Sequence, residues 1–225
     1  MKKALLSILL LLPAVVFGQK DVTTFLGIPV DGKKTDFIQC LKKKGFSLDY
    51  HSDEGVMSGK FNGKDVDVYI QTNNDKVCRI IVSDKTETRS ESDIRIAFNK
   101  LIRQFKNNDR YVEYPIPNEE ISEDTDLSYE ITVNKKRFQA VFYQSPLEVD
   151  SIDIEEISNI QKRIEESKSK KNTIEALEIF GELDKYFKKY FANKFVWFMI
   201  SESYGRYSIT IFYENEYNMA NGEDL

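Results

Sequence analysis

The chain has 225 residues, of which 32 are Lys or Arg and 37 are Asp or Glu, so its formal net charge is −5 at pH 7. Proteins that bind nucleic acid need clustered basic residues that neutralise phosphates, and this acidic balance argues against a nucleic-acid partner. One dense basic run, residues 168–171, lies among acidic residues and is typical of a solvated helix end. The length allows one large domain or two small ones.

The first 18 residues have the pattern of a signal peptide. Lys2 and Lys3 precede an apolar run over residues 4–12, and residues 16–18 have side chains that suit a signal peptidase. We predict cleavage after Gly18, which leaves a periplasmic or secreted protein. The apolar run is shorter than the roughly 20 residues that a membrane-spanning helix needs. No later segment approaches that length, so no transmembrane segment is expected after cleavage.

Two cysteines, Cys40 and Cys78, would enter an oxidising compartment after export. We expect Cys40 on a helix and Cys78 on the inward face of a strand, and such elements commonly pack together. A disulfide between Cys40 and Cys78 is therefore one prediction. Two buried thiols that behave as small apolar side chains are the alternative, because two cysteines in a chain of this length do not make a disulfide framework.

Residues 46–83 carry the clearest structural pattern, four short segments in which apolar and polar residues alternate. Turn residues separate the segments, which predicts an antiparallel meander. The clearest turn is Asn62-Gly63, because both central residues of a tight type I′ turn need positive φ, which Asn and Gly adopt readily. A short amphipathic helix that ends at Gly45 is expected before the meander, and a second helix is expected between residues 90 and 108.

Residues 111–126 differ in composition from the segments around them. Two prolines and several carboxylates make this stretch an acidic connector. Beyond it we expect a second hairpin around Asn134, a helical hairpin over residues 151–192 and a third hairpin around residues 202–205.

Together these elements predict an α+β fold in which an antiparallel meander and hairpins pack against helices. The expected first domain, residues 19–110, has a helix, a four-strand meander and a helix. The second, residues 111–225, has a hairpin, a helical hairpin and a hairpin. A weak sequence similarity between the hairpins at Asn62 and Asn134 would fit two similar halves. A single sheet that joins all three hairpins is the alternative.

Candidate catalytic groups are few. His51 is the only histidine, and without a nucleophile motif nearby it is most simply an exposed turn residue. Asp65 and Asp67 share one face of a strand and could serve glycoside hydrolysis, although such residues more often only solubilise a strand. The acidic connector lacks the ligand spacing of a calcium loop. We therefore predict no catalytic residue, no metal site and no cofactor.

Aromatic residues crowd the last 40 residues of the chain. Strand alternation should direct many of these rings into the core, but exposed Tyr and Trp side chains can anchor partners or stack on sugars. In the third hairpin a Tyr-Gly turn can present rings at low entropic cost. We predict Trp197, Tyr204 and Tyr207 as a binding surface for an unknown protein or glycan ligand.

Three stretches of the sequence carry a resemblance to other proteins: FLGIPVDGKKTDFIQCLKKKGF, GKFNGKDVDVYI and the C-terminal NGEDL. They resemble a group of uncharacterised secreted proteins common in gut Bacteroidetes. The first stretch is the more specific, and together they cover under a third of the chain. The resemblance implies an exported protein with an N-terminal helix before a small sheet, and it implies no activity, ligand or catalytic residue.

An enzyme needs polar groups held in a fixed constellation, and this sequence has no phosphate loop, nucleophile elbow or metal-ligand spacing. A binding protein needs only a shaped surface. We therefore favour a non-catalytic exported protein that binds a partner or interacts with the cell envelope. The alternative is a secreted hydrolase with a carboxylate site that no motif marks.

Overall fold

The computed structural model describes residues 21–49, 55–113, 117–169 and 173–219. The predicted signal peptide over residues 1–18, its cleavage site and His51 lie outside these ranges. None of the described helices is both long enough and apolar enough to cross a membrane. Export and cleavage after Gly18 therefore stay predictions.

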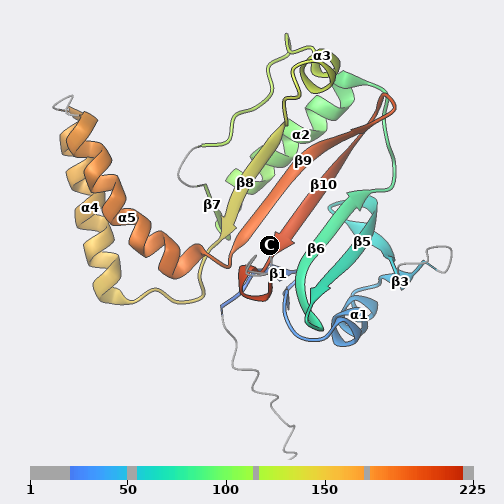
Figure 1. Cartoon of the computed structure of the whole chain (residues 1–225), viewed down its shortest axis with the longest axis horizontal. Helices are drawn as coiled ribbons and strands as arrows, with labels where there is room; N and C mark the ends of the chain where they lie inside the picture. Colours follow the sequence, from blue (N-terminus) through green and yellow to red (C-terminus); the bar gives the residue numbers. More distant parts are fainter. Residues whose placement is uncertain (1–20, 50–54, 114–116, 170–172, 220–225) are drawn as a thin grey trace, which may run out of the picture.

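An eight-stranded antiparallel sheet forms the centre of the protein (Figure 1). Its strands lie in the order β3-β4-β5-β6-β10-β9-β8-β7. Their bounds are β3 Ser47–Leu48, β4 Met57–Phe61, β5 Lys64–Asn73, β6 Lys76–Asp84, β7 Tyr111–Val112, β8 Gln139–Gln144, β9 Phe195–Ser203 and β10 Arg206–Glu214. The expected α+β class with antiparallel hairpins is confirmed, and strands β3 to β6 of the first expected domain join β7 to β10 of the second in this one sheet.

The predicted meander is present as β3 to β6. Asn62 and Gly63 have φ angles of 49° and 78°, as the two-residue turn between β4 and β5 requires. Buried and more exposed side chains alternate along the middle of β5, because successive residues of a strand point to opposite faces. The pairing of β5 with β6 shifts between Gln71 and Thr72, which leaves Cys78 of β6 without a direct partner on β5.

Two amphipathic helices, α1 (Lys34–Lys43) and α2 (Glu91–Lys106), cover one face of the sheet. α1 contacts β5 and β6, whereas α2 contacts β7, β9 and β10. Both helices join one core cluster with the inward residues of the strands, such as Leu41 of α1, Phe98 of α2 and Phe198 of β9. In Figure 1, α2 lies behind β8 and β9. The opposite face of the sheet carries neither helix.

The sheet has two topologically similar halves, each a helix followed by four antiparallel strands. α1 precedes β3 to β6, α2 precedes β7 to β10, and β6 pairs with β10 where the halves meet. By its contacts α2 belongs with the strands that follow it, whereas the expected boundary after residue 110 leaves it with the first domain. The division into two domains stays a prediction.

The predicted hairpin around Asn134 is wrong in its first arm. Leu127–Thr132 forms a short helix, α3, and not a strand. Asp126 starts this helix by accepting a hydrogen bond from the backbone N–H of Tyr129 at 2.8 Å, an arrangement that stabilises a helix start. The second arm is strand β8. The sequence similarity around Asn62 and Asn134 therefore does not align equivalent turns.

Hydrogen bonds hold the acidic connector against α2. Arg95 of the helix donates hydrogen bonds to the carbonyls of Glu123 and Thr125, at 2.7 and 3.1 Å. Asn99 exchanges two hydrogen bonds with the backbone of Ile121, at 2.9 and 2.8 Å. The connector thus packs along the helix, and buried Ile121 joins the core cluster.

A side-chain amide from the connector covers the outer edge of β8. Asn118 donates to the carbonyl of Val141 at 2.6 Å and accepts from its N–H at 2.7 Å. These two bonds replace those of a neighbouring strand, since β7 pairs only with Tyr143 and Gln144. An edge strand satisfied in this way is protected from pairing with another chain.

A helical hairpin is inserted between β8 and β9, as predicted for residues 151–192. Helices α4 (Ser151–Ser169) and α5 (Thr173–Phe191) project away from the sheet (Figure 1). They pack on each other through a small core of their own, with Ile160, Ile164, Ile179 and Tyr186. At the base of the hairpin, Phe187 packs edge-on against Tyr143 of β8, with ring centroids 4.6 Å apart.

Short elements at both ends of the described chain complete the fold. β1 (Thr24–Phe25) and β2 (Ile28–Pro29) form a separate two-stranded sheet, and η1 (Glu216–Asn218) follows β10. The side chain of Gln144 holds β1, accepting from the N–H of Thr24 and donating to its carbonyl, both at 2.8 Å.

Both cysteines are free thiols in the structure. Cys40 of α1 is half-buried and Cys78 of β6 is buried. The disulfide between them stays a prediction.

Candidate functional site

The three predicted binding residues do not share one surface. Tyr204 is fully exposed at the turn between β9 and β10. Tyr207 is only 3 % exposed and belongs to the core cluster on the helix-covered face. Trp197 is half-buried on the opposite face. The expectation of an exposed Tyr207 is wrong, because strand alternation places it on the same side as the buried Ile209.

Trp197 is part of an apolar row that crosses five neighbouring strands on the face opposite α1 and α2. Direct cross-strand pairs join Tyr69 to Ile81, Ile81 to Phe212, Phe212 to Trp197, and Trp197 to Val141. Directly paired residues point to the same face, so these side chains form one line, roughly 19 Å long at the usual strand spacing. All five are half-buried. We call them the open-face row.

The rings of Trp197 and Phe212 stack face to face in this row. Their centroids are 4.0 Å apart and their planes differ by 9°. The two rings stack along the direction of the row, so each ring covers one face of the other. On their outer sides, the two rings are followed by Ile81 and Val141 in the adjacent strands. The row therefore presents ring edges and aliphatic groups to its surroundings.

A buried carboxylate fixes the orientation of the indole. Trp197 Nε1 donates to Glu214 Oε1 at 2.9 Å, and Arg79 Nη2 lies 2.8 Å from the same oxygen. The side chain of Glu214 is 8 % exposed and that of Arg79 is 32 % exposed. Because Glu214 satisfies the indole N–H, the polar edge of Trp197 needs no external partner. Burial, with the charge of Glu214, raises the pKa of the nearby Glu216.

Mostly polar side chains border the open-face row. Toward the β9–β10 turn, the next line of cross-strand pairs contains Asp67, Ser83, Thr210, Met199 and Gln139. Toward the other end, the next line contains Gln71, Arg79 and Glu214 on β5, β6 and β10. On β9 and β8 the border is instead aromatic, with the pair Phe195 and Tyr143, and Phe187 of α5 packs against Tyr143. An apolar centre with a mostly polar rim is the usual anatomy of a protein–protein interface.

The carboxylates considered for a hydrolase have ion-pair partners. Asp65 pairs with Lys60 at 3.3 Å, and Asp67 pairs with Lys85 at 3.1 Å. Ser58 donates to Asp67 at 2.6 Å and accepts from Lys85 at 2.9 Å. The hydrogen bond with Asp67 raises the pKa of Lys85, so this ammonium stays protonated at neutral pH and cannot serve Ser58 as a general base.

Thiol and metal chemistry find little support in the described part of the chain. Burial raises the pKa of the Cys78 thiol, which keeps it in the less reactive protonated form. Within residues 21–49, 55–113, 117–169 and 173–219, no group of three or more His, Cys, Asp or Glu side chains is placed to hold a metal ion.

The chain matches no family model, no curated protein and no solved structure. The resemblance to secreted proteins of gut Bacteroidetes therefore stays a prediction.

The open-face row was not predicted from the sequence, although the sequence contains an indication of it. The central strands have apolar residues at consecutive positions, in residues 80–82, 195–200 and 211–213. Consecutive apolar residues in a strand indicate that both faces are covered. The register that aligns Ile81, Phe212 and Trp197 could not be read from the sequence, because β6 and β10 are far apart in the chain.

Proposed function

We propose that this chain is an exported, non-catalytic binding protein that docks another protein on the face of its sheet opposite α1 and α2. The observation that carries the proposal is the open-face row. Strands β6, β9 and β10 have the composition of strands covered on both faces, but α1 and α2 cover only one. Export rests on the signal-peptide pattern of residues 1–18.

The geometry of the rings favours a protein over a glycan as the partner. A sugar stacks on the flat face of an aromatic ring, whereas Trp197 and Phe212 turn one face to each other. Ring edges and aliphatic side chains at the centre of a mostly polar rim suit the apolar side chains of a second protein. Such centrally placed aromatic residues contribute most of the binding energy in many interfaces.

Site-specific photo-crosslinking in envelope extract tests the proposal. A photoreactive phenylalanine analogue at position 212 should give an adduct with one defined protein, and the same analogue at position 204 should not. Adding Ile81→Glu should reduce that adduct at least tenfold, because a charge would be buried in the interface without a partner. Val133→Glu is the matched control, since Val133 directly follows α3, outside the row, and is 58 % exposed.

Three outcomes would contradict the proposal. One is an adduct from position 204 alone, which would move the binding site to the hairpin tip. Another is an adduct whose yield falls equally with Ile81→Glu and Val133→Glu. The third is protection of position 212 by soluble polysaccharide, which would make the ligand a glycan.

A further inference from the structure

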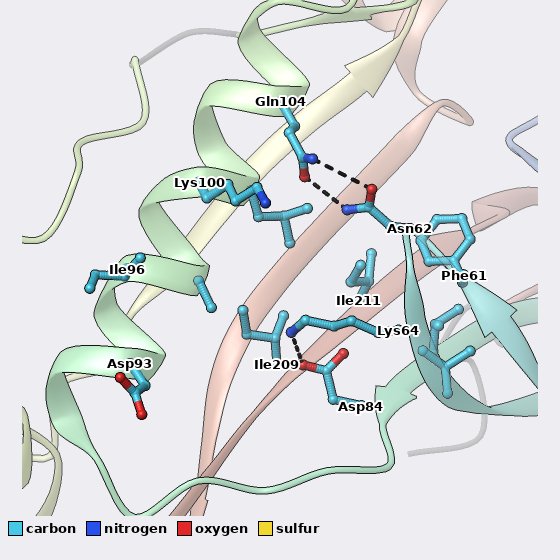
Figure 2. A pocket seen from close by; sticks show the side chains of 14 residues that line it. Phe61, Asn62, Lys64, Asp84, Asp93, Ile96, Lys100, Gln104, Ile209 and Ile211 are labelled. Atoms are coloured by element: carbon cyan, nitrogen blue, oxygen red, sulfur yellow. Dashed lines mark hydrogen bonds and ion pairs between the residues drawn. The ribbon is translucent and has the colours of Figure 1, made fainter.

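A groove lies on the other face of the sheet, between α2 and the turn that joins β4 to β5. It consists of two cavities of about 300 and 660 Å³, within the size range of small-molecule sites. They share five lining residues, Phe61, Asn62, Lys100, Leu101 and Gln104. We call the two cavities together the α2 groove. Figure 2 shows the smaller one, with α2 as one wall and β10 behind it.

One polar pair crosses the α2 groove, and a second lies on the sheet side of it (Figure 2). Asn62 and Gln104 face each other across it, with Asn62 Nδ2 donating to Gln104 Oε1 at 2.8 Å. Lys64 and Asp84 form an ion pair at 2.5 Å. Asn62 and Gln104 are both exposed, so this bridge can open without unfolding the sheet.

The smaller cavity has an apolar floor. Val66, Val82, Ile209 and Ile211 line it from three strands of the sheet. All four belong to the core cluster. On the rim, Ile96 of α2 is 58 % exposed, although it lies within the helix that covers this face. This end of the groove therefore suits an apolar group.

The larger cavity is positively charged. Four cations line it, Lys60, Lys100, Arg103 and Arg110, and none of the described residues around it is Asp or Glu. Lys60 and Arg103 have ion-pair partners at its rim, Asp65 at 3.3 Å and Glu120 at 3.5 Å. Lys100 and Arg110 form no ion pair with any residue that the structure describes.

The position of these cations is not explained by helix stabilisation alone. Arg103 lies in the last turn of α2, where a positive charge offsets the helix dipole. Lys60 and Arg110 come from other segments and converge on the same cavity. Arg110 also lies near the buried phenol of Tyr213, where it opposes the strong rise that burial causes in the pKa of Tyr213. Such convergence in a chain of net charge −5 indicates an anion site.

We infer that the α2 groove binds a small amphipathic anion. Its acidic head lies among Lys100, Arg103 and Arg110, and its apolar part passes the Asn62–Gln104 bridge onto the floor of the smaller cavity. This site is on the helix-covered face, so it is separate from the open-face row.

Titration of the purified protein with decanoate, followed by backbone amide NMR, tests the inference. Decanoate below its micelle-forming concentration should shift amides of α2 and of the β4–β5 turn, in a saturable way. Decyl maltoside, which has the tail without the charge, and inorganic phosphate, which has the charge without the tail, should bind at least tenfold more weakly. The double variant Lys100→Gln, Arg110→Gln should weaken decanoate binding about tenfold, because two charge-assisted contacts are lost.

The matched control is Lys42→Gln, Lys43→Gln, which removes two exposed charges from α1, outside the groove. It should leave decanoate affinity unchanged. Equal loss in both double variants would overturn the inference, since it would show only a net-charge effect. The absence of saturable shifts, or shifts on the open face, would also overturn it. So would binding to phosphatidylglycerol vesicles without binding of decanoate, which would indicate a membrane surface as the ligand.

Discussion

Replacing Phe198 with alanine is expected to lower the free energy of unfolding by about 3–5 kcal/mol, the usual cost of deleting a fully buried aromatic ring. Phe198 lies in β9 with no exposed surface. Its ring centroid is 5.2 Å from that of Phe98 and 5.4 Å from that of Phe105, both on α2, and 6.1 Å from that of Phe142 on β8. The substitution removes the ring that joins α2 to the second half of the sheet.

Chemical denaturation measures this effect. The midpoint should fall strongly while the dependence of the unfolding free energy on denaturant stays the same. Tyr204→Ala is the control, because a fully exposed side chain should change stability by no more than about 0.5 kcal/mol. A loss below about 1 kcal/mol for Phe198→Ala would mean that the packing of α2 on β9 is not as described.

Replacing Glu214 with alanine is expected to cost about 2–3 kcal/mol, because one buried oxygen serves both Trp197 and Arg79. Its removal leaves the indole N–H without a partner and Arg79 without its counter-charge. The cost stays below the roughly 3–5 kcal/mol of a fully buried pair, since the Arg79 side chain is 32 % exposed and water can reach it.

The conservative variant Glu214→Gln keeps an oxygen acceptor for the indole and should lose about half as much. Denaturation of both variants, followed by the fluorescence of Trp197, gives the two values. If Glu214→Ala unfolds at the same denaturant concentration as the unchanged protein, Glu214 does not anchor the indole and the geometry of the open-face row would need another explanation.

Local patterns predicted much of the sheet. Alternation and the Asn62-Gly63 turn predicted the meander, because both depend only on neighbouring residues. Apolar spacing likewise predicted α2 and the helical hairpin of α4 and α5. The same patterns wrongly predict a strand over residues 127–133, most of which are helical. The apolar residues of this segment alternate as in a strand: Leu127, Tyr129, Ile131 and Val133. The hydrogen bond from the N–H of Tyr129 to Asp126 stabilises the start of the helix, whereas a strand would need a neighbouring strand to pair with.

The candidate site was only partly predictable. The enrichment of Trp in binding surfaces favours Trp197, and Trp197 does lie on the face opposite α1 and α2. The same argument favours Tyr207, but the structure shows that Tyr207 is buried. In β10 both faces have apolar residues, so alternation separates Tyr207 from Phe212 but does not say which face the helices cover. That depends on pairing between distant strands, as does the meeting of Ile81 with Phe212.

The fluorescence of Trp197 tests the central claim most directly, because it is the only tryptophan in the chain. Acrylamide is the suitable quencher, since it is neutral and its approach to the indole does not depend on the charges of Glu214 and Arg79. We expect partial quenching in the isolated protein and a clear reduction of quenching when the cross-linked partner is added. An indole that acrylamide cannot reach in the isolated protein, or one that stays equally accessible with the partner bound, would contradict docking on the open-face row.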